Sequence, residues 1–131
     1  MKASVNQTLR SAQVVAFAPT KDFKPAQEFY EDTLGLTLLG KDDFALLFEV
    51  GGTRIRIAKV GSFKPAPYTI LGWRVKDVLQ TVASLARRGV VFERFPGMQQ
   101  DEAGIWAAPS GARVAWFKDP DGNVLSIFQQ S

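Results

Sequence analysis

The same order of structural signals occurs twice along this chain, and the repeat limits the folds that the sequence can adopt. In the first half a short apolar run precedes Lys21-Asp22 and a segment with helical spacing. In the second half another apolar run precedes Lys76-Asp77 and a second such segment, at an offset of 55 residues (76 minus 21). Several strand-like segments follow each predicted helix. The sequence therefore predicts an α+β protein made of two β-α-β-β-β units.

Both predicted helices have recognisable ends. Asp22 is a suitable N-cap, and Lys76-Asp77 occupies the same place before the second helix. Gly35 and Gly89 stand where a helix C-terminus favours a residue with positive φ. The residues expected to face the core are Phe23, Ala26, Phe29, Tyr30 and Leu34 in the first helix, and Val78, Val82, Leu85 and Ala86 in the second.

The predicted strands are short and bounded by turn residues. The clearest covers residues 53–60, where Ile55 and Ile57 share one face and Arg54, Arg56 and Ala58 share the other. Gly51-Gly52 makes the tight turn before it. The other strand-like segments are residues 12–18, 36–39, 44–50, 68–75 and 90–95, a polar loop follows over 96–104, and two or three strands close the chain.

These boundaries predict one domain, residues 1–131, containing a first module at 12–60, a connector at 61–67 with two prolines, and a second module at 68–129. A chain of 131 residues can bury a core of its own without disulfides or metals. It is therefore notable for function, and not for folding, that the chain contains neither cysteine nor histidine.

The missing residue types exclude whole classes of chemistry. Without cysteine there are no thiolate nucleophiles, disulfides, zinc–cysteine sites or iron–sulfur clusters. Without histidine there is no serine–histidine triad, and a metal site would have to use oxygen ligands. No serine lies in a nucleophile-elbow context, and no glycine-rich phosphate loop is present.

The charge pattern does not favour nucleic acid or membrane as a partner. The formal net charge is +3 and the sequence pI is about 9.4. The basic residues are scattered among acids, however, and Arg87-Arg88 is the only pair of adjacent basic residues in the sequence. Nucleic-acid binding usually needs a clustered basic stripe. No apolar run approaches the length of a membrane span, and residues 1–10 lack the apolar centre of a signal peptide. We therefore expect a cytoplasmic protein that binds neither nucleic acid nor membrane.

Two motifs connect the repeat to a known family. FYEDTLGL at residues 29–36 lies at the end of the first helix, and FKDPDGNVLSI at residues 117–127 precedes and enters the last strand. Taken alone, Asp-Pro-Asp-Gly-Asn is ordinary turn chemistry. Together, in this two-module layout over residues 12–129, the motifs resemble the vicinal oxygen chelate superfamily of glyoxalases, bleomycin-resistance proteins and extradiol dioxygenases. The resemblance implies a cupped, partly open barrel around a pocket, commonly in a homodimer.

In metal-dependent members of that superfamily, four ligands project into the cup. By resemblance these positions correspond to Val15, with Gln13 two residues away on the same face, and to Arg56, Ile70 and Ser126. These side chains do not form a divalent-cation site, and a cation beside Arg56 would be repelled. We therefore expect no metal and no cofactor.

Strand alternation predicts which side chains line the cup. Leu71, Trp73 and Val75 are expected to pack beneath the helix, although Trp73 could also reach the pocket. Trp106 and Trp116 could each be pocket wall or core. Asp101, beside Glu102 in a lid-like loop, could be a general acid or base, contact a cationic group, or simply be solvated. The candidate ligand-binding residues are Arg56, Arg54, Arg74, Ile70, Val15, Ser126, Phe128, Trp106, Trp116 and Asp101.

Arg56 allows two interpretations. On an inward strand face its guanidinium needs an acidic partner or a wet pocket. Glu49, across the Gly51-Gly52 hairpin, is a candidate salt-bridge partner. Alternatively Arg56, with Arg74, binds a carboxylate or other anion of a ligand, which the planar guanidinium suits.

The function expected from these observations is that of a metal-free small-molecule-binding protein with an aromatic or anionic ligand in the cup. One alternative is a glyoxalase-like lyase or isomerase, and another is an accessory domain that binds a protein partner.

Overall fold

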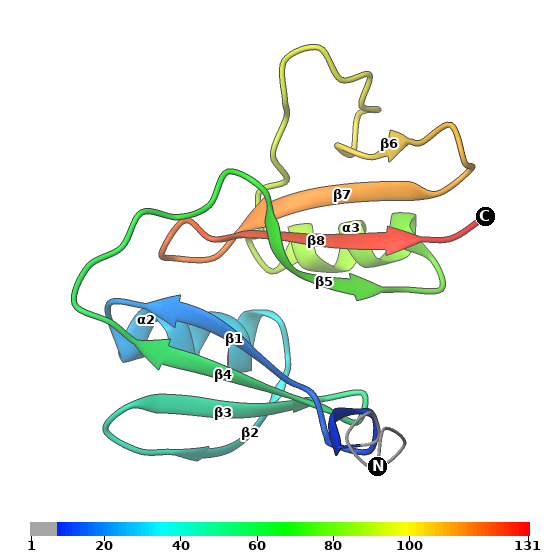
Figure 1. Ribbon diagram of the computed structural model, residues 1–131. Helices are drawn as coiled ribbons and strands as arrows, with labels where there is room; N and C mark the ends of the chain where they lie inside the picture. Colours follow the sequence, from blue (N-terminus) through cyan, green and yellow to red (C-terminus); the bar gives the residue numbers. More distant parts are fainter. Residues whose placement is uncertain (1–7) are drawn as a thin grey trace.

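The computed structural model describes residues 8–131, which form two four-stranded mixed sheets and few helices. The first sheet has the strand order β1-β4-β3-β2 and the second the order β5-β8-β7-β6, so the two have the same topology (Figure 1). In each sheet the first and last strands of the unit are parallel neighbours and the others pair antiparallel. The strands are β1 Val15–Thr20, β2 Thr37–Lys41, β3 Ala45–Val50, β4 Thr53–Lys59, β5 Thr69–Arg74, β6 Trp106–Ala107, β7 Arg113–Lys118 and β8 Val124–Gln129.

Both helices begin where the sequence predicted, at an aspartate. The Asp22 carboxylate accepts a hydrogen bond from the Lys24 N–H at the start of α2 (Phe23–Gln27), and Asp77 accepts one from the Gln80 N–H at the start of α3 (Val78–Arg87). After Gln27 the first helix widens into the π-helical segment η1 (Glu28–Thr33). The helix ends at Thr33, and Gly35 follows its C-cap Leu34 with a φ of 75°, which suits glycine, as expected.

The strand predicted for residues 90–95 is wrong, because this stretch belongs to a long loop between α3 and β6. Its ladder-type pairing with β7 is limited to an isolated bridge between Phe92 and Phe117. Side chains hold the loop instead: Gln100 accepts from the Phe95 N–H at 2.8 Å and donates to the Glu93 and Gly104 carbonyls. Since side chains satisfy these backbone groups, the chain needs no regular ladder here.

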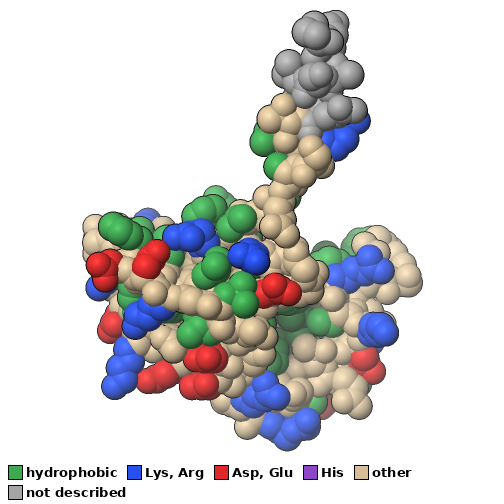
Figure 2. All heavy atoms as spheres, turned by 90° about the horizontal axis from the view of Figure 1, so that it is seen from below, with side chains coloured by type: hydrophobic (Ala, Val, Ile, Leu, Met, Phe, Trp, Pro, Cys, Tyr) green, Lys and Arg blue, Asp and Glu red, His purple; other side chains and the backbone are tan. Residues whose placement is uncertain are grey.

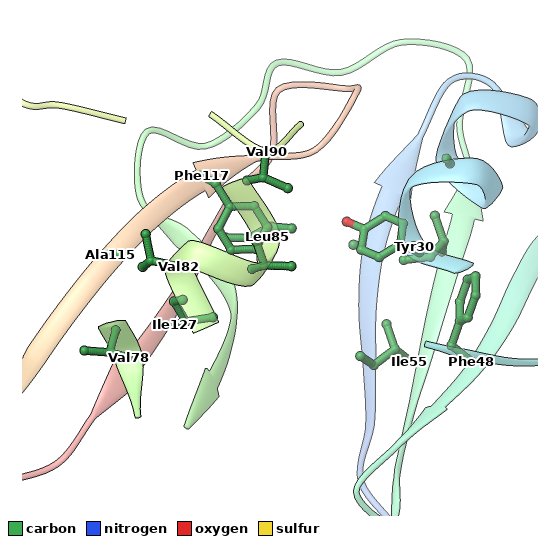
Figure 3. Packing of buried hydrophobic residues seen from close by; sticks show 14 of the residues in the cluster. Tyr30, Phe48, Ile55, Val78, Val82, Leu85, Val90, Ala115, Phe117 and Ile127 are labelled. Atoms are coloured by element: carbon green, nitrogen blue, oxygen red, sulfur yellow. The ribbon is translucent and has the colours of Figure 1, made fainter. Parts of the chain in front are cut away.

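The helices cover one face of each sheet and leave the other face open (Figure 1). On β4, Ile55 and Ile57 are 4% and 0% exposed on the covered face, while Arg54 and Arg56 lie on the open face, as alternation predicted. β1 and β5 lie side by side where the two sheets meet. The buried hydrophobic side chains form one cluster to which both sheets contribute (Figure 3).

The turn between β7 and β8 fastens the two sheets together. Its Asp119 is 6% exposed and accepts a 2.6 Å hydrogen bond from the hydroxyl of Tyr30, which is fully buried in η1. Asn123 donates to Asp119 at 2.8 Å and to the Pro19 carbonyl of β1 at 2.9 Å. Thr20 of β1 donates to Asp121 at 2.6 Å. The Asp-Pro-Asp-Gly-Asn motif is therefore a turn that also joins the N-terminal and C-terminal halves.

Candidate functional site

The open face of the first sheet carries an arginine between two apolar neighbours. Arg56 of β4 pairs with Phe17 of β1 on one side and with Leu47 of β3 on the other. Paired residues of neighbouring strands point to the same face, so all three side chains share the open side. Phe17 is 61% exposed, and Arg56 is half-buried. The result is a cation beside an accessible aromatic ring.

The salt bridge between Arg56 and Glu49 that the sequence allowed is not formed. The two-residue turn pairs Val50 with Thr53, which places Glu49 opposite Arg54 and Leu47 opposite Arg56. Within residues 8–131 the single ion pair is between Lys118 and Glu93. Arg56 therefore has no carboxylate bound to its guanidinium in this part of the chain.

The charge of Arg56 affects the pKa of Asp42, which lies in the turn between β2 and β3. The Asp42 carboxylate accepts hydrogen bonds from the N–H groups of Phe44 at 2.7 Å and Ala45 at 2.9 Å, and these bonds lower its pKa. The charge of Arg56 lowers the same pKa as a smaller contribution. Asp42 is thus held ionised by backbone donors, and the guanidinium of Arg56 keeps its own hydrogen-bonding capacity.

The open face of the second sheet is aromatic. Ser126 of β8 lies between Gly72 of β5 and Trp116 of β7. The Trp116 ring contacts the ring of Trp106, 6.1 Å away between centroids, and the ring of Phe95 in an edge-on arrangement at 5.4 Å. Gly72 packs closely against β8, because a Cβ there would lie 3.1 Å from the Ser126 hydroxyl oxygen. Trp106 and Trp116 therefore belong to the open face.

Phe128 lies on the same open face, between Arg74 and Val114 of the neighbouring strands. Arg74 is exposed at the end of β5, and Val15 is 37% exposed beside Arg54 on the first sheet. Most of the predicted cup residues thus share the open faces of their sheets. They divide between two sheets that meet edge to edge within one chain.

Three residues have surroundings that the sequence did not specify. The β5–β8 register shifts between Thr69 and Leu71, and Ile70 packs against the hydrophobic core, so its expected place facing the cup is not supported. Asp101 uses one carboxylate oxygen to accept from the N–H groups of Ala103 and Ile105, each at 2.9 Å, which gives it a structural role in the loop. Trp73 stacks on Phe117 and packs against the core, in agreement with its expected position beneath the helix.

Two aromatic residues of the open faces were missed from the sequence. Phe17 was overlooked although it alternates with Val15 along β1, which was a sufficient signal. Phe95 had no such signal, because the loop that carries it is shaped by the side-chain hydrogen bonds of Gln100.

The donor set does not fit the divalent metal that the superfamily's metal-dependent members hold. The corresponding positions are Val15, Arg56, Ile70 and Ser126, of which only the serine offers an oxygen. Between Thr8 and Ser131, no three His, Cys, Asp or Glu side chains are grouped so that they could bind a metal ion. Valine and isoleucine offer no lone pair, and an arginine repels a cation, so these four residues would not bind a divalent metal.

The hollows in the surface lie elsewhere. One has a volume of about 450 Å³ and is lined by Arg74, Lys76 and residues 129–131. A second, of about 320 Å³, separates α3 from the long loop, and a smaller apolar one lies between the two sheets on their helix-covered side. Of the predicted cup residues, Arg74 alone lines one of these hollows.

None of the helices within residues 8–131 has the length and apolar character needed to cross a membrane.

Comparison with known proteins places these features in a family. The model of the Glyoxalase/Bleomycin resistance protein/Dioxygenase superfamily matches residues 10–127. YraH of Bacillus subtilis (strain 168) is 32% identical over 123 residues, a match that covers 82% of this chain and 90% of YraH.

Two solved structures have the same fold over nearly the whole chain. TnmS3, an antibiotic binding protein from Streptomyces sp. CB03234, is 26% identical with a TM-score of 0.67, covering 92% of this chain and 97% of TnmS3. A bleomycin resistance determinant encoded on transposon Tn5 is 19% identical with a TM-score of 0.72, covering 92% and 99% of the two chains. The chain therefore belongs to the Glyoxalase/Bleomycin resistance protein/Dioxygenase superfamily.

Proposed function

We propose that this protein binds an aromatic anion without a metal, and that Arg56 binds the anionic group while aromatic side chains of the open faces hold the ring. The observation that carries the proposal is the guanidinium of Arg56, which pairs with no carboxylate of residues 8–131 and lies beside the exposed ring of Phe17. A half-buried arginine without an acid attracts a carboxylate, and its planar shape allows two parallel hydrogen bonds.

The second sheet supplies the complementary surface. Trp106, Trp116 and Phe95 contact one another on its open face and offer flat apolar area of the kind that binds planar ligands. The sequence similarity to TnmS3, an antibiotic binding protein, supports binding in preference to catalysis. The absence of a suitable metal donor set supports the same choice.

We propose further that the complete cup forms between two copies of the chain. Within one chain the two open faces lie edge to edge, and Arg56 and Trp116 belong to different sheets. A homodimer that places the first sheet of one copy opposite the second sheet of the other would bring these residues to one ligand. It would also cover Phe17 and Val15, which are 61% and 37% exposed in the single chain. Figure 2 shows, on the face seen from below, hydrophobic side chains interspersed with both basic and acidic ones.

The test is a titration with naphthalene-2-carboxylate in which the quenching of tryptophan fluorescence measures binding. The neutral naphthalene-2-carboxamide is the matched control ligand. Arg56→Ala should weaken carboxylate binding by about 10- to 100-fold, because a charge-assisted hydrogen bond contributes about 1.5–3 kcal/mol. It should change carboxamide binding by less than about threefold. Arg113→Ala is the control, since Arg113 lies on the opposite face of β7 from Trp116.

Unchanged carboxylate affinity in Arg56→Ala would refute the proposed role of Arg56. Sedimentation of the free protein as a monomer at micromolar concentration would refute the shared cup. Elemental analysis that finds one tightly bound metal per chain would favour the lyase or isomerase alternative, and a protein partner retained through purification would favour the accessory-domain alternative.

A further inference from the structure

The apolar hollow between the two sheets is separate from their open faces. It lies on the helix-covered side and has a volume of about 170 Å³. Leu34 and Leu36, which follow η1, line it from the first half of the chain, and Trp73, Leu85 and Phe117 line it from the second. In Figure 3, Leu85 and Phe117 lie on the second-half side of the cluster, opposite Tyr30 of the first half. We refer to this hollow as the seam pocket.

The seam pocket has a closed floor and an accessible rim. Leu85, Phe117 and Ile127 are 8%, 1% and 2% exposed and form the floor. Leu36 and Trp73 are half-buried at the rim. A small molecule could therefore enter from solvent and contact a buried surface.

The lining offers almost nothing to water. Its polar side-chain groups are the Thr81 hydroxyl, which already donates to the Asp77 carbonyl at 2.9 Å, and the indole N–H of Trp73. An ordered water needs about two to four hydrogen-bonding partners, and apolar cavities of about 150 Å³ that lack them stay dry and bind benzene. The seam pocket is of about that size and has a mainly apolar lining, and it opens to solvent at its rim. The Trp73 and Phe117 rings, stacked at 6.4 Å and 24°, give it an aromatic wall.

We propose that the seam pocket binds one uncharged six-membered aromatic ring, unsubstituted or with a small alkyl group. No charged side chain lines the pocket, so a carboxylate or ammonium group on the ring would lose its hydration without gaining a partner. This site differs in ligand class and in position from the open-face site around Arg56. Because its walls come from both halves, an occupant adds contacts across the junction between the sheets.

The distribution of the three tryptophans allows a direct test with toluene. Trp73 lines the seam pocket, whereas Trp106 and Trp116 lie on the open face. The double variant Trp106→Phe/Trp116→Phe therefore reports on the seam pocket alone, and Trp73→Phe reports on the open face alone. Toluene should change the emission of the double variant saturably, and at about ten times its Kd it should raise the Tm by about 5 °C. Benzoate and benzylammonium should have no such effect at the same concentration.

Filling the pocket should abolish the response. Thr81→Phe introduces a ring from α3, and Leu36→Phe introduces one from the opposite wall, so the result does not depend on one variant folding well. Leu79→Phe is the control: Leu79 is on the same helix, is 52% exposed and lines the hollow beside the long loop instead. It should bind toluene like the unmodified protein.

Other outcomes would overturn the proposal. If Trp73 emission does not change with toluene, the pocket is only a packing gap. If Thr81→Phe and Leu36→Phe keep the response, or if only Trp73→Phe shows it, toluene binds elsewhere. If Thr81→Phe and Leu36→Phe instead change the sedimentation coefficient, a second copy of the chain covers the seam pocket. None of these results affects the proposal for Arg56, which is tested with a charged probe on the other face.

Discussion

Removal of one oxygen atom from the buried junction between the two halves should be costly. Tyr30→Phe deletes the hydroxyl that donates to Asp119 at 2.6 Å and leaves the ring, which is 0% exposed, in place. Asp119 keeps three donors, the Asn123 side-chain amide and the N–H groups of Asp121 and Asn123, so no acceptor is left wholly unsatisfied. The loss is thus that of one hydrogen bond to a charged group, about 1.5–3 kcal/mol.

The expected change is large enough to measure by thermal or urea unfolding. An unfolding entropy of about 2.1 cal/mol/K per residue gives about 0.28 kcal/mol/K for 131 residues. A loss of about 2 kcal/mol therefore lowers Tm by about 7 °C. Tyr68→Phe is the matched control, because Tyr68 is the only other tyrosine and is 66% exposed, and it should change the unfolding free energy by less than about 0.5 kcal/mol. Equal unfolding free energies for the two variants would refute the reasoning.

Three further substitutions test other parts of the structure. Asp42→Asn should lower the free energy of unfolding, relative to the unmodified protein, at pH values above the ordinary carboxyl pKa. This difference should vanish as the pH falls through the lowered pKa of Asp42, which urea unfolding at several pH values measures. A difference independent of pH would contradict the prediction. Gly122→Ala should lower the unfolding free energy by about 1–2 kcal/mol, because φ is 87° and the new Cβ would lie 3.3 Å from Pro65, whereas Gly61→Ala, which meets no atom within 4 Å, should not show this loss. Ile127→Ala should cost about 2–5 kcal/mol in urea unfolding, since the side chain is 2% exposed in the core, and a loss below 1 kcal/mol would mean that the core collapses around it.

Much of the fold could be predicted because local rules and tertiary packing agree. The alternation of Ile55 and Ile57 with Arg54 and Arg56 was enough to assign the faces of β4, since a strand has a period of two. Asp22 and Asp77 marked the starts of the helices for an equally local reason, the unpaired N–H groups of a first turn. The repeated order of strand and helix signals predicted the α+β architecture of two units, and the family motifs added a partly open barrel; the structure has two open sheets, in a fold that the similar structures share.

The secondary-structure predictions failed where contacts outside the segment, or an unusual hydrogen-bond spacing within it, decide its conformation. Residues 90–95 are apolar enough for a strand, but Gln100 and the carbonyls that it binds shape them as a loop, and no pattern in the segment itself predicts that. The π-helical segment η1 could not be predicted either. The Leu34 N–H donates to the carbonyl of Phe29, five residues earlier, and the 3.6-residue period of an α-helix does not predict this bond.

The pairing of Arg56 could have been predicted. A two-residue loop at Gly51-Gly52 requires Val50 to face Thr53, and counting outward places Leu47, not Glu49, opposite Arg56. The placement of the candidate site on two sheets was harder, because strand alternation assigns a face and not the angle between sheets. The contact between β1 and β5, which only the folded chain reveals, is where the two sheets meet.

The junction at the β7–β8 turn also has a consequence for how the protein is made. Tyr30 meets Asp119 across 89 positions, and the Pro19 carbonyl meets Asn123 across 104. During synthesis the first sheet can form early, but the phenol of Tyr30 has no acceptor until residue 119 has left the ribosome. A nascent chain halted before that point lacks the bonds that Tyr30 and Pro19 make with this turn, so cooperative unfolding of the two halves should appear only after the last turn has emerged.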